Sequence, residues 1–126
     1  MMTSFPWLAK YQKGVPETIN PDIYPNIPAI LDRLVERRAS CPCFTNRGTT
    51  LTAGQTKSLS EDLAGYLQSL PGMKKGDRVA IMMPNLLQYP VSLFGILKAG
   101  FIVVNVNPLY TARELEHQLK AAGAKA

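Results

Sequence analysis

The stretch Val79-Ala80-Ile81-Met82-Met83 decides the fold class, because a continuous apolar run of this length is typical of a strand covered on both faces. A second apolar run, residues 101–104, follows Gly100. Between the two runs, Asn85-x-x-Gln88 resembles a capping box and predicts a helix. Strand, helix and strand in this order predict a right-handed crossover with adjacent parallel strands. The expected fold class is therefore α/β.

The sequence before this unit predicts a helix and a small antiparallel hairpin. Asn26 is an N-cap candidate for a helix that ends near Ala39. Short strands at residues 43–45 and 49–51 flank Arg47-Gly48, and Gly48 supplies the turn. The apolar stripe expected on the helix comprises Ile27, Ile30, Leu31, Leu34 and Val35.

A second helix is expected after the hairpin. Thr52-x-x-Gln55 fits a capping box, and Pro71-Gly72 is the stop signal. The apolar stripe of this helix comprises Leu59, Leu63, Tyr66, Leu67 and Leu70. In the next helix, expected from Asn85, Pro90 should bend the helix or delay its regular part.

The last predicted helix is capped by Thr111-x-x-Glu114 and ends at Gly123. Its apolar stripe comprises Ala112, Leu115, Leu119 and Ala122. Another strand should follow, so we expect the chain to be the first part of a larger domain. Self-association should then follow, through pairing of an open strand edge, exchange of the proline-rich N-terminal arm or packing of exposed helix faces.

Two parts are expected along the chain. Residues 1–26 form an extended, proline-rich N-terminal arm, because prolines remove backbone donors and restrict φ. Residues 27–126 form the domain itself, a layered sheet with parallel central strands, flanking helices and the small hairpin.

Composition limits the classes of partner. The 46% hydrophobic and 18% charged residues fit one globular unit, and the net charge is +5. The adjacent basic pairs, Arg37-Arg38 and Lys74-Lys75, do not line one helix face, which argues against nucleic acid. The N-terminal segment does not read as a secretory leader, and residues 91–104 are too short and interrupted to span a bilayer, so a cytoplasmic location is expected.

No catalytic set can be assigned from the residues. The spacing Gly95 to Gly100 lacks the Lys and hydroxyl of a phosphate loop and lies at a helix end, the wrong polarity for an anion. His117 is expected at a surface or boundary, without a nucleophile beside it. Glu61-Asp62 are expected to be solvated helix charges, as are Glu114 and Glu116. We therefore expect no catalytic, cofactor-binding or metal-binding residue in this chain.

The two cysteines are expected to be reduced. Cys41 and Cys43 are too close in sequence for an ordinary structural disulfide, and a metal site would need further ligands. We expect two thiols packed in or beside a strand.

Two strings resemble one family, the bacterial long-chain fatty acid–CoA ligases among the adenylate-forming enzymes. They are Pro84-Asn85-Leu86-Leu87-Gln88-Tyr89-Pro90 and Asn107-Pro108-Leu109-Tyr110-Thr111-x-Arg113-Glu114-Leu115-Glu116-His117-Gln118. Gly76-Asp77-Arg78-Val79 is shared more widely in the superfamily. The departures, Cys41-Pro42-Cys43 and Ala53-Gly54-Gln55, concern local packing at the hairpin.

The resemblance implies an enzyme that joins a long-chain fatty acid to CoA through an acyl-adenylate, with ATP and Mg²⁺. It also implies that the phosphate loop and the catalytic lysine lie beyond Ala126, so this chain alone should be inactive and should bind none of these cofactors. Peripheral association with the cytoplasmic membrane stays open. The alternatives are part of another acyl- or aryl-adenylating enzyme, or a non-catalytic dimerisation or membrane-surface module.

Overall fold

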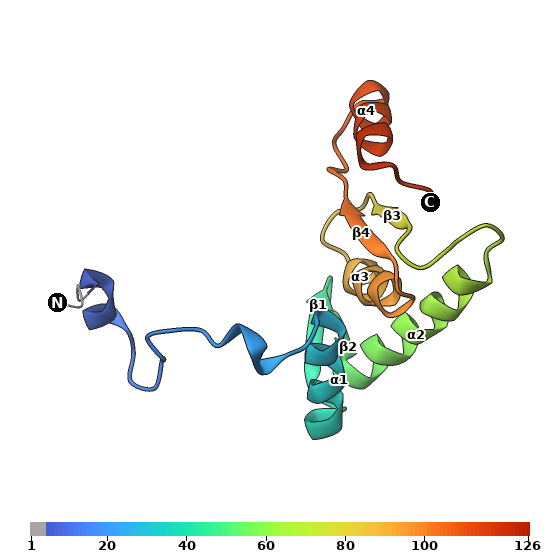
Figure 1. Cartoon of the computed structure of the whole chain (residues 1–126). Helices are drawn as coiled ribbons and strands as arrows, with labels where there is room; N and C mark the ends of the chain where they lie inside the picture. The colour runs from blue at the N-terminus through green and yellow to red at the C-terminus, as the bar shows by residue number, and fades with distance from the viewer. Residues whose placement is uncertain (1–4) are drawn as a thin grey trace.

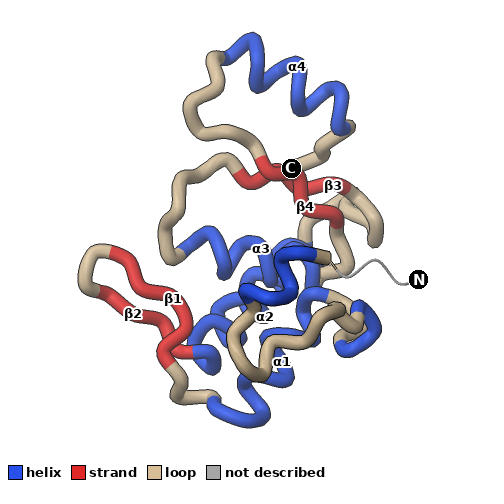
Figure 2. The backbone as a smooth tube through the Cα atoms, turned by 90° about the vertical axis from the view of Figure 1, so that its left-hand side faces the viewer, coloured by secondary structure: helices blue, strands red, loops and turns tan. Residues whose placement is uncertain are grey.

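The computed structural model describes residues 5–126 (Figures 1 and 2). The chain forms a body of helices and short strands, from which the N-terminal arm extends on one side and α4 projects at the C-terminal end. In chain order the elements are η1 (Pro6–Lys10), η2 (Pro21–Ile23), α1 (Ile27–Arg38), β1 (Pro42–Asn46), β2 (Thr49–Thr52), α2 (Ala53–Ser69), β3 (Arg78–Ile81), α3 (Gln88–Lys98), β4 (Ile102–Asn105) and α4 (Ala112–Ala122). The predicted α/β class is confirmed.

The parallel pair lies where the two apolar runs predict it. Strands β3 and β4 pair in parallel, with Arg78 opposite Ile102 and Ile81 opposite Asn105. The strand is shorter than the predicted run, because Met82 already leaves the ladder and is 39% exposed. Helix α3 connects the two strands, so the predicted crossover is confirmed.

The last three residues extend this sheet. Ala124 forms a parallel bridge with Arg78, and the Lys125 N–H donates to the Arg78 carbonyl at 2.8 Å. The Ala80 N–H donates in turn to the carbonyl of Ala126 at 2.6 Å. These residues therefore begin the further strand that was expected after Gly123, and they lie beside β3. In this sheet, within the described residues, it is β4 that pairs on one side only.

Helix α2 packs against α3 through small side chains, which the predicted stripe missed. Thr56 and Ser60 are fully buried, while Leu59 and Tyr66, both assigned to the core, are 44% and 61% exposed. The Ser60 hydroxyl donates to the Thr56 carbonyl at 2.7 Å, so its polarity is satisfied inside the helix. The prediction was wrong because two helices that approach closely need small side chains at their contact, even where these side chains are polar.

Gly95 explains this close approach. A Cβ at Gly95 would lie 3.0 Å from the Ser60 carbonyl oxygen and 3.0 Å from Cδ2 of Leu63. The core beside the contact consists of Ala64, Leu67, Val79, Ile81, Ile96, Ala99 and Phe101. The two helices and the parallel pair therefore share one apolar cluster.

The start of α3 differs from the prediction. The helix begins at Gln88, and its N-cap, Leu87, makes no side-chain cap, so the capping box expected at Asn85 is wrong. The carbonyl of Asn85 instead accepts a hydrogen bond from Asn46 Nδ2 at 3.0 Å. Pro90 falls in the first turn, where the missing N–H removes no helical hydrogen bond, so the predicted delay is confirmed.

The other predicted caps and the hairpin are confirmed. Asn26 caps α1, and capping boxes begin α2 at Thr52 and α4 at Thr111. Strands β1 and β2 are antiparallel, and their turn uses positive φ at Arg47 (46°) and Gly48 (80°). The α1 stripe is only partly correct: Leu31 is buried, while Ile27 and Ile30 are about half exposed.

The described part of the arm is largely extended and exposed, apart from the short 3₁₀ turns η1 and η2 (Figure 1). Each turn begins at a proline, where the fixed φ favours a helical start. The Arg33 guanidinium lies 5.4 Å from the centre of the Tyr24 ring and attaches the end of the arm to α1. Residues 1–4 of the expected arm lie outside the described residues.

Candidate functional site

The carboxyl ends of β3 and β4 form the edge at which open parallel sheets bind ligands. The Val106 N–H donates to the Ile81 carbonyl at 2.9 Å, which holds the chain after β4 against the end of β3. The Tyr89 hydroxyl lies 3.0 Å from Asn105 Oδ1 and connects α3 to this edge. Two loops, after β3 and after β4, therefore meet at one place.

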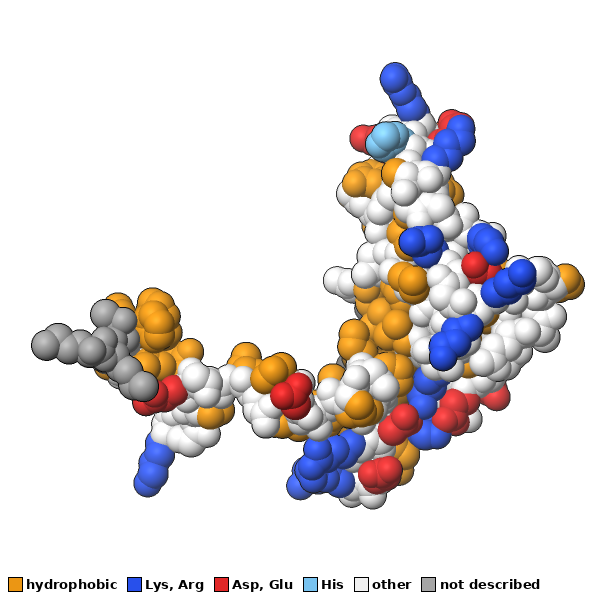
Figure 3. Space-filling view, in the orientation of Figure 1, with side chains coloured by type: hydrophobic (Ala, Val, Ile, Leu, Met, Phe, Trp, Pro, Cys, Tyr) orange, Lys and Arg blue, Asp and Glu red, His pale blue; other side chains and the backbone are white. Residues whose placement is uncertain are grey.

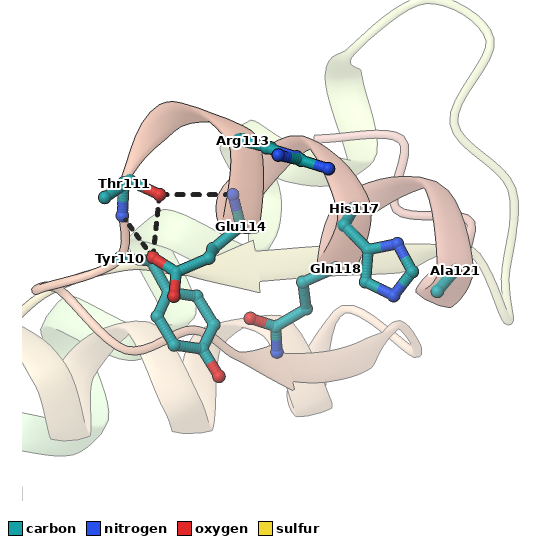
Figure 4. A pocket seen from close by; sticks show the side chains of 7 residues that line it. All are labelled: Tyr110, Thr111, Arg113, Glu114, His117, Gln118 and Ala121. Carbon is teal, nitrogen blue, oxygen red and sulfur yellow. Dashed lines mark hydrogen bonds between the residues drawn. The ribbon is translucent and has the colours of Figure 1, made fainter.

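Helix α4 stands over this edge and borders an open hollow (Figure 4). The residues that line it are Tyr110, Thr111, Arg113, Glu114, His117, Gln118 and Ala121. Arg113, His117 and Ala121 are four residues apart in turn and share one side of the helix. No residue of α4 is fully buried, so the helix is held by few contacts.

Glu114 is committed to the helix cap. Its Oε2 accepts from the Thr111 N–H at 2.8 Å and from the Thr111 hydroxyl at 2.7 Å. These hydrogen bonds lower the pKa of Glu114, the hydroxyl contributing most. Figure 4 shows the carboxylate turned back toward Thr111. Glu114 is therefore an ionised cap, as its capping box predicts, and a poor proton acceptor for catalysis.

Gln118 connects α4 to the sheet. Its Nε2 donates to the Asn105 carbonyl at 2.9 Å, while its Oε1 is buried and has no hydrogen-bond partner. Periodicity could not find this role, because Gln118 lies on the side of the helix next to the Leu115 and Leu119 stripe. Because nearly all buried acceptors in folded proteins are hydrogen-bonded, we expect another group to bring a donor to Gln118 Oε1.

The hollow presents Arg113 and His117 beside the ionised Glu114, without an arrangement that could perform catalysis. Arg113 supplies a permanent positive charge, and His117, exposed as predicted, supplies an imidazole on the same side. Neither is brought beside a nucleophile in Figure 4. Within residues 5–126, no group of three or more metal-ligating side chains is present.

Gly95 and Gly100, whose spacing was rejected as a phosphate loop, have structural roles. Gly95 admits α2, and Gly100 takes a positive φ of 84° just after α3 ends. Lys98, between them, donates to Asp32 Oδ1 at 2.6 Å and to Glu61 Oε1 at 3.4 Å. This ion pair joins three helices, and sequence analysis missed it because Asp32 is distant along the chain.

The remaining candidates stay apart from the hollow. Glu61 also pairs with Lys57, whose hydrogen bond lowers the pKa of Glu61. Glu61 and Asp62 are exposed helix charges, as predicted. Cys41 and Cys43 are free thiols, also as predicted. On the face shown in Figure 3, basic and acidic side chains are interspersed over the body.

Comparison with known proteins gives the family. The profile described as "AMP-binding enzyme" matches residues 20–126. The chain belongs to the AMP-binding enzyme family. Within this family, it is 57% identical over 120 residues to the long-chain-fatty-acid–CoA ligase of Escherichia coli O6:H1, covering 95% of the chain and 21% of that relative. The ligase of the same name from Bacillus subtilis strain 168 is 39% identical, with 97% and 21% covered.

Solved structures agree with this family assignment. The N-terminal subdomain of Klebsiella oxytoca NpsA, in complex with 3-hydroxyanthranilyl-AMSN, matches with a TM-score of 0.73 and 26% identity, over 79% of this chain and 25% of that one. The anthranilate CoA ligase AuaEII with anthranoyl-AMP matches with a TM-score of 0.75 and 27% identity, over 81% and 20%. The chain spans about a fifth of the length of the curated relatives it matches.

Proposed function

We propose that this chain is part of a long-chain fatty acid–CoA ligase. Such an enzyme converts fatty acid, ATP and CoA into acyl-CoA, AMP and pyrophosphate through an acyl-adenylate. The observation that carries the proposal is the 57% identity to a bacterial ligase of this name over nearly the whole chain. The AMP-binding family supports the adenylate-forming step. Mg²⁺ assists by neutralising phosphate charge.

The role of this segment is to build the framework of the site. Residues 27–126 supply the first part of the large N-terminal domain, with the parallel pair and its covering helices, and residues 1–26 supply an arm. The nucleotide, metal and acyl contacts come from residues outside this segment. The supporting observation is that two charged groups of this segment already have structural partners. Glu114 caps helix α4, and Lys98 forms an ion pair with Asp32.

One experiment tests the proposal. The longest reading frame that contains this sequence is expressed, and pyrophosphate release is measured with ATP, CoA and palmitate, 4-coumarate or anthranilate as acid. We expect palmitate to be the preferred acid. Preference for an aromatic acid would replace the long-chain specificity with the aryl-adenylating alternative, and the absence of pyrophosphate release with every acid would favour the binding-module reading.

The 126-residue chain is the second arm of this test. We expect it to release no pyrophosphate above a heat-killed control, because its role is structural. Release by the short chain would place catalytic groups within it and would overturn the framework role.

The location and the associations of the chain are proposals of the same kind. We place the protein in the cytoplasm, with peripheral contact to the membrane, where a net charge of +5 favours anionic lipid. Within residues 5–126, no helix has the length and hydrophobicity needed to cross a bilayer.

Self-association is proposed through the open side of β4 and the exposed Leu109, which is 87% accessible. Light scattering after size exclusion, at roughly tens of micromolar, tests this association. A monomer across that range contradicts it.

A further inference from the structure

The first described turn of the arm carries aromatic side chains that the protein leaves half exposed. The rings of Phe5 and Trp7 stack on each other, with centroids 4.6 Å apart and an angle of 18° between their planes. Each of the two is 52% exposed, and Tyr11, just after η1, is 44% exposed. Figures 1 and 3 show this turn at the end of the arm that is far from the body, with hydrophobic side chains on its surface. Exposed aromatic side chains gathered in this way indicate a surface that contacts a partner.

Residues 5–11, which we call the aromatic turn, form a compact unit with its own hydrogen bonds. Pro6 begins η1 at a position that its fixed φ favours. The Leu8 N–H donates to the Phe5 carbonyl, and the Tyr11 N–H donates to the Leu8 carbonyl, each at 3.1 Å. Because these backbone groups are paired within the segment, moving the turn from water into less polar surroundings costs less free energy.

The charges in and beside the aromatic turn have one sign. Lys10 lies in the last part of η1, Lys13 follows it, and residues 5–16 contain no aspartate or glutamate. Both lysines are exposed. In a 3₁₀ helix, residues three apart lie on the same side, as Trp7 and Lys10 do in η1. Aromatic rings beside lysines are typical of segments at the membrane–water interface, where the rings lie at the level of the headgroups and the lysines meet anionic phosphate.

We propose that the aromatic turn is the part of this protein that binds the surface of an anionic lipid bilayer. Phe5 and Trp7 enter the headgroup region, while Lys10 and Lys13 pair with the lipid phosphates. A second copy of the chain suits the turn less well, because each copy carries a net charge of +5 and repels it. The inference rests on the proposed peripheral contact with the membrane. It is independent of the proposed ligase chemistry, which pyrophosphate release measures separately.

The test uses the full 126-residue chain and vesicles of phosphatidylcholine, with or without an equal part of phosphatidylglycerol. Trp7 is the only tryptophan, so its emission reports on the aromatic turn directly. We expect the phosphatidylglycerol vesicles to shift this emission to shorter wavelength and to reduce its quenching by acrylamide, while phosphatidylcholine alone has little effect. Co-sedimentation with the same vesicles measures affinity. The double variant Lys10→Gln with Lys13→Gln should weaken binding by about tenfold or more.

Two matched controls separate the turn from the body. Lys74→Gln with Lys120→Gln removes the same charge from exposed positions of the body, and Tyr66→Ala removes an exposed ring from α2, for comparison with Trp7→Ala. Both controls should bind nearly as tightly as the unmodified chain, and Trp7→Ala should bind less tightly.

Three results overturn the inference. The first is unchanged Trp7 emission with phosphatidylglycerol vesicles, even where the chain sediments with them, since the body then makes the contact. The second is equal weakening of binding by the two pairs of lysine substitutions. The third is an emission shift that grows with protein concentration in the absence of lipid, which assigns the aromatic turn to a second copy of the chain.

Discussion

The contact between α2 and α3 makes the sharpest prediction about stability. In Gly95→Ala, the new Cβ lies 3.0 Å from the Ser60 carbonyl oxygen and within 3.1 Å of two carbons of Leu63. The Ser60 oxygen belongs to a helix backbone and cannot move alone, so the helices must separate. Overpacking of this kind costs about 1–3 kcal/mol, while alanine in a helix recovers roughly 1 kcal/mol relative to glycine. We expect a net loss of about 1 kcal/mol in the free energy of unfolding.

Gly65→Ala is the matched control, because Gly65 also lies within α2 but has nothing within 4 Å of its added Cβ. There the helix propensity acts alone, and we expect a gain of about 1 kcal/mol. Urea unfolding followed by the helical circular dichroism signal measures both, since the only tryptophan, Trp7, lies in the arm. If Gly95→Ala stabilises the chain as much as Gly65→Ala does, the close-packing argument is refuted.

Three further predictions concern an ion pair, a carboxylate and a cap. Lys98→Ala should cost about 1 kcal/mol, less in high salt, because Asp32 loses its cation and the covered lysine stem loses its packing; urea unfolding at two salt concentrations measures both effects. The hydrogen bond from Lys125 holds the pKa of Asp77 below its ordinary value. Its stabilisation is therefore present above the unfolded pKa and lost as pH falls below about 4, so Asp77→Asn should flatten the acid limb of stability against pH. Thr111→Ala should cost α4 about 1 kcal/mol, seen as faster amide exchange in α4 alone, since no residue of this helix is fully buried. Equal acceleration of exchange in α2 would contradict a local effect.

Much of the fold could be predicted from the sequence, because it depends on interactions between residues close together in the chain. The capping boxes at Thr52 and Thr111 and the turn at Gly48 depend on residues within a few positions of one another, so their patterns could be read directly. The parallel pair followed from two apolar runs and the handedness of crossovers. The family strings at residues 84–90 and 107–118 led to the family that the whole-chain comparison then established.

The misreadings arise because local patterns report residue type and spacing, and not how the elements fit together. The α2 stripe named Leu59 and Tyr66, yet the contact with α3 selected Thr56 and Ser60 because the helices approach closely at Gly95. At the start of α3, a capping pattern was present, but the helix began later because the preceding loop is held by the hairpin.

The features of the fold and of the candidate site fall into two groups, those that short sequence patterns predict and those that need the tertiary structure. The sequence by itself determined the family, the α/β class, the caps of three helices and the reduced state of the two cysteines, because each depends on residue type and short spacing. Only the tertiary structure decided that Gln118 reaches Asn105 at the sheet edge, that Lys98 joins three helices and that residues 124–126 pair with β3. These contacts join residues distant along the chain, and their geometry depends on how α2, α3 and the sheet pack in three dimensions.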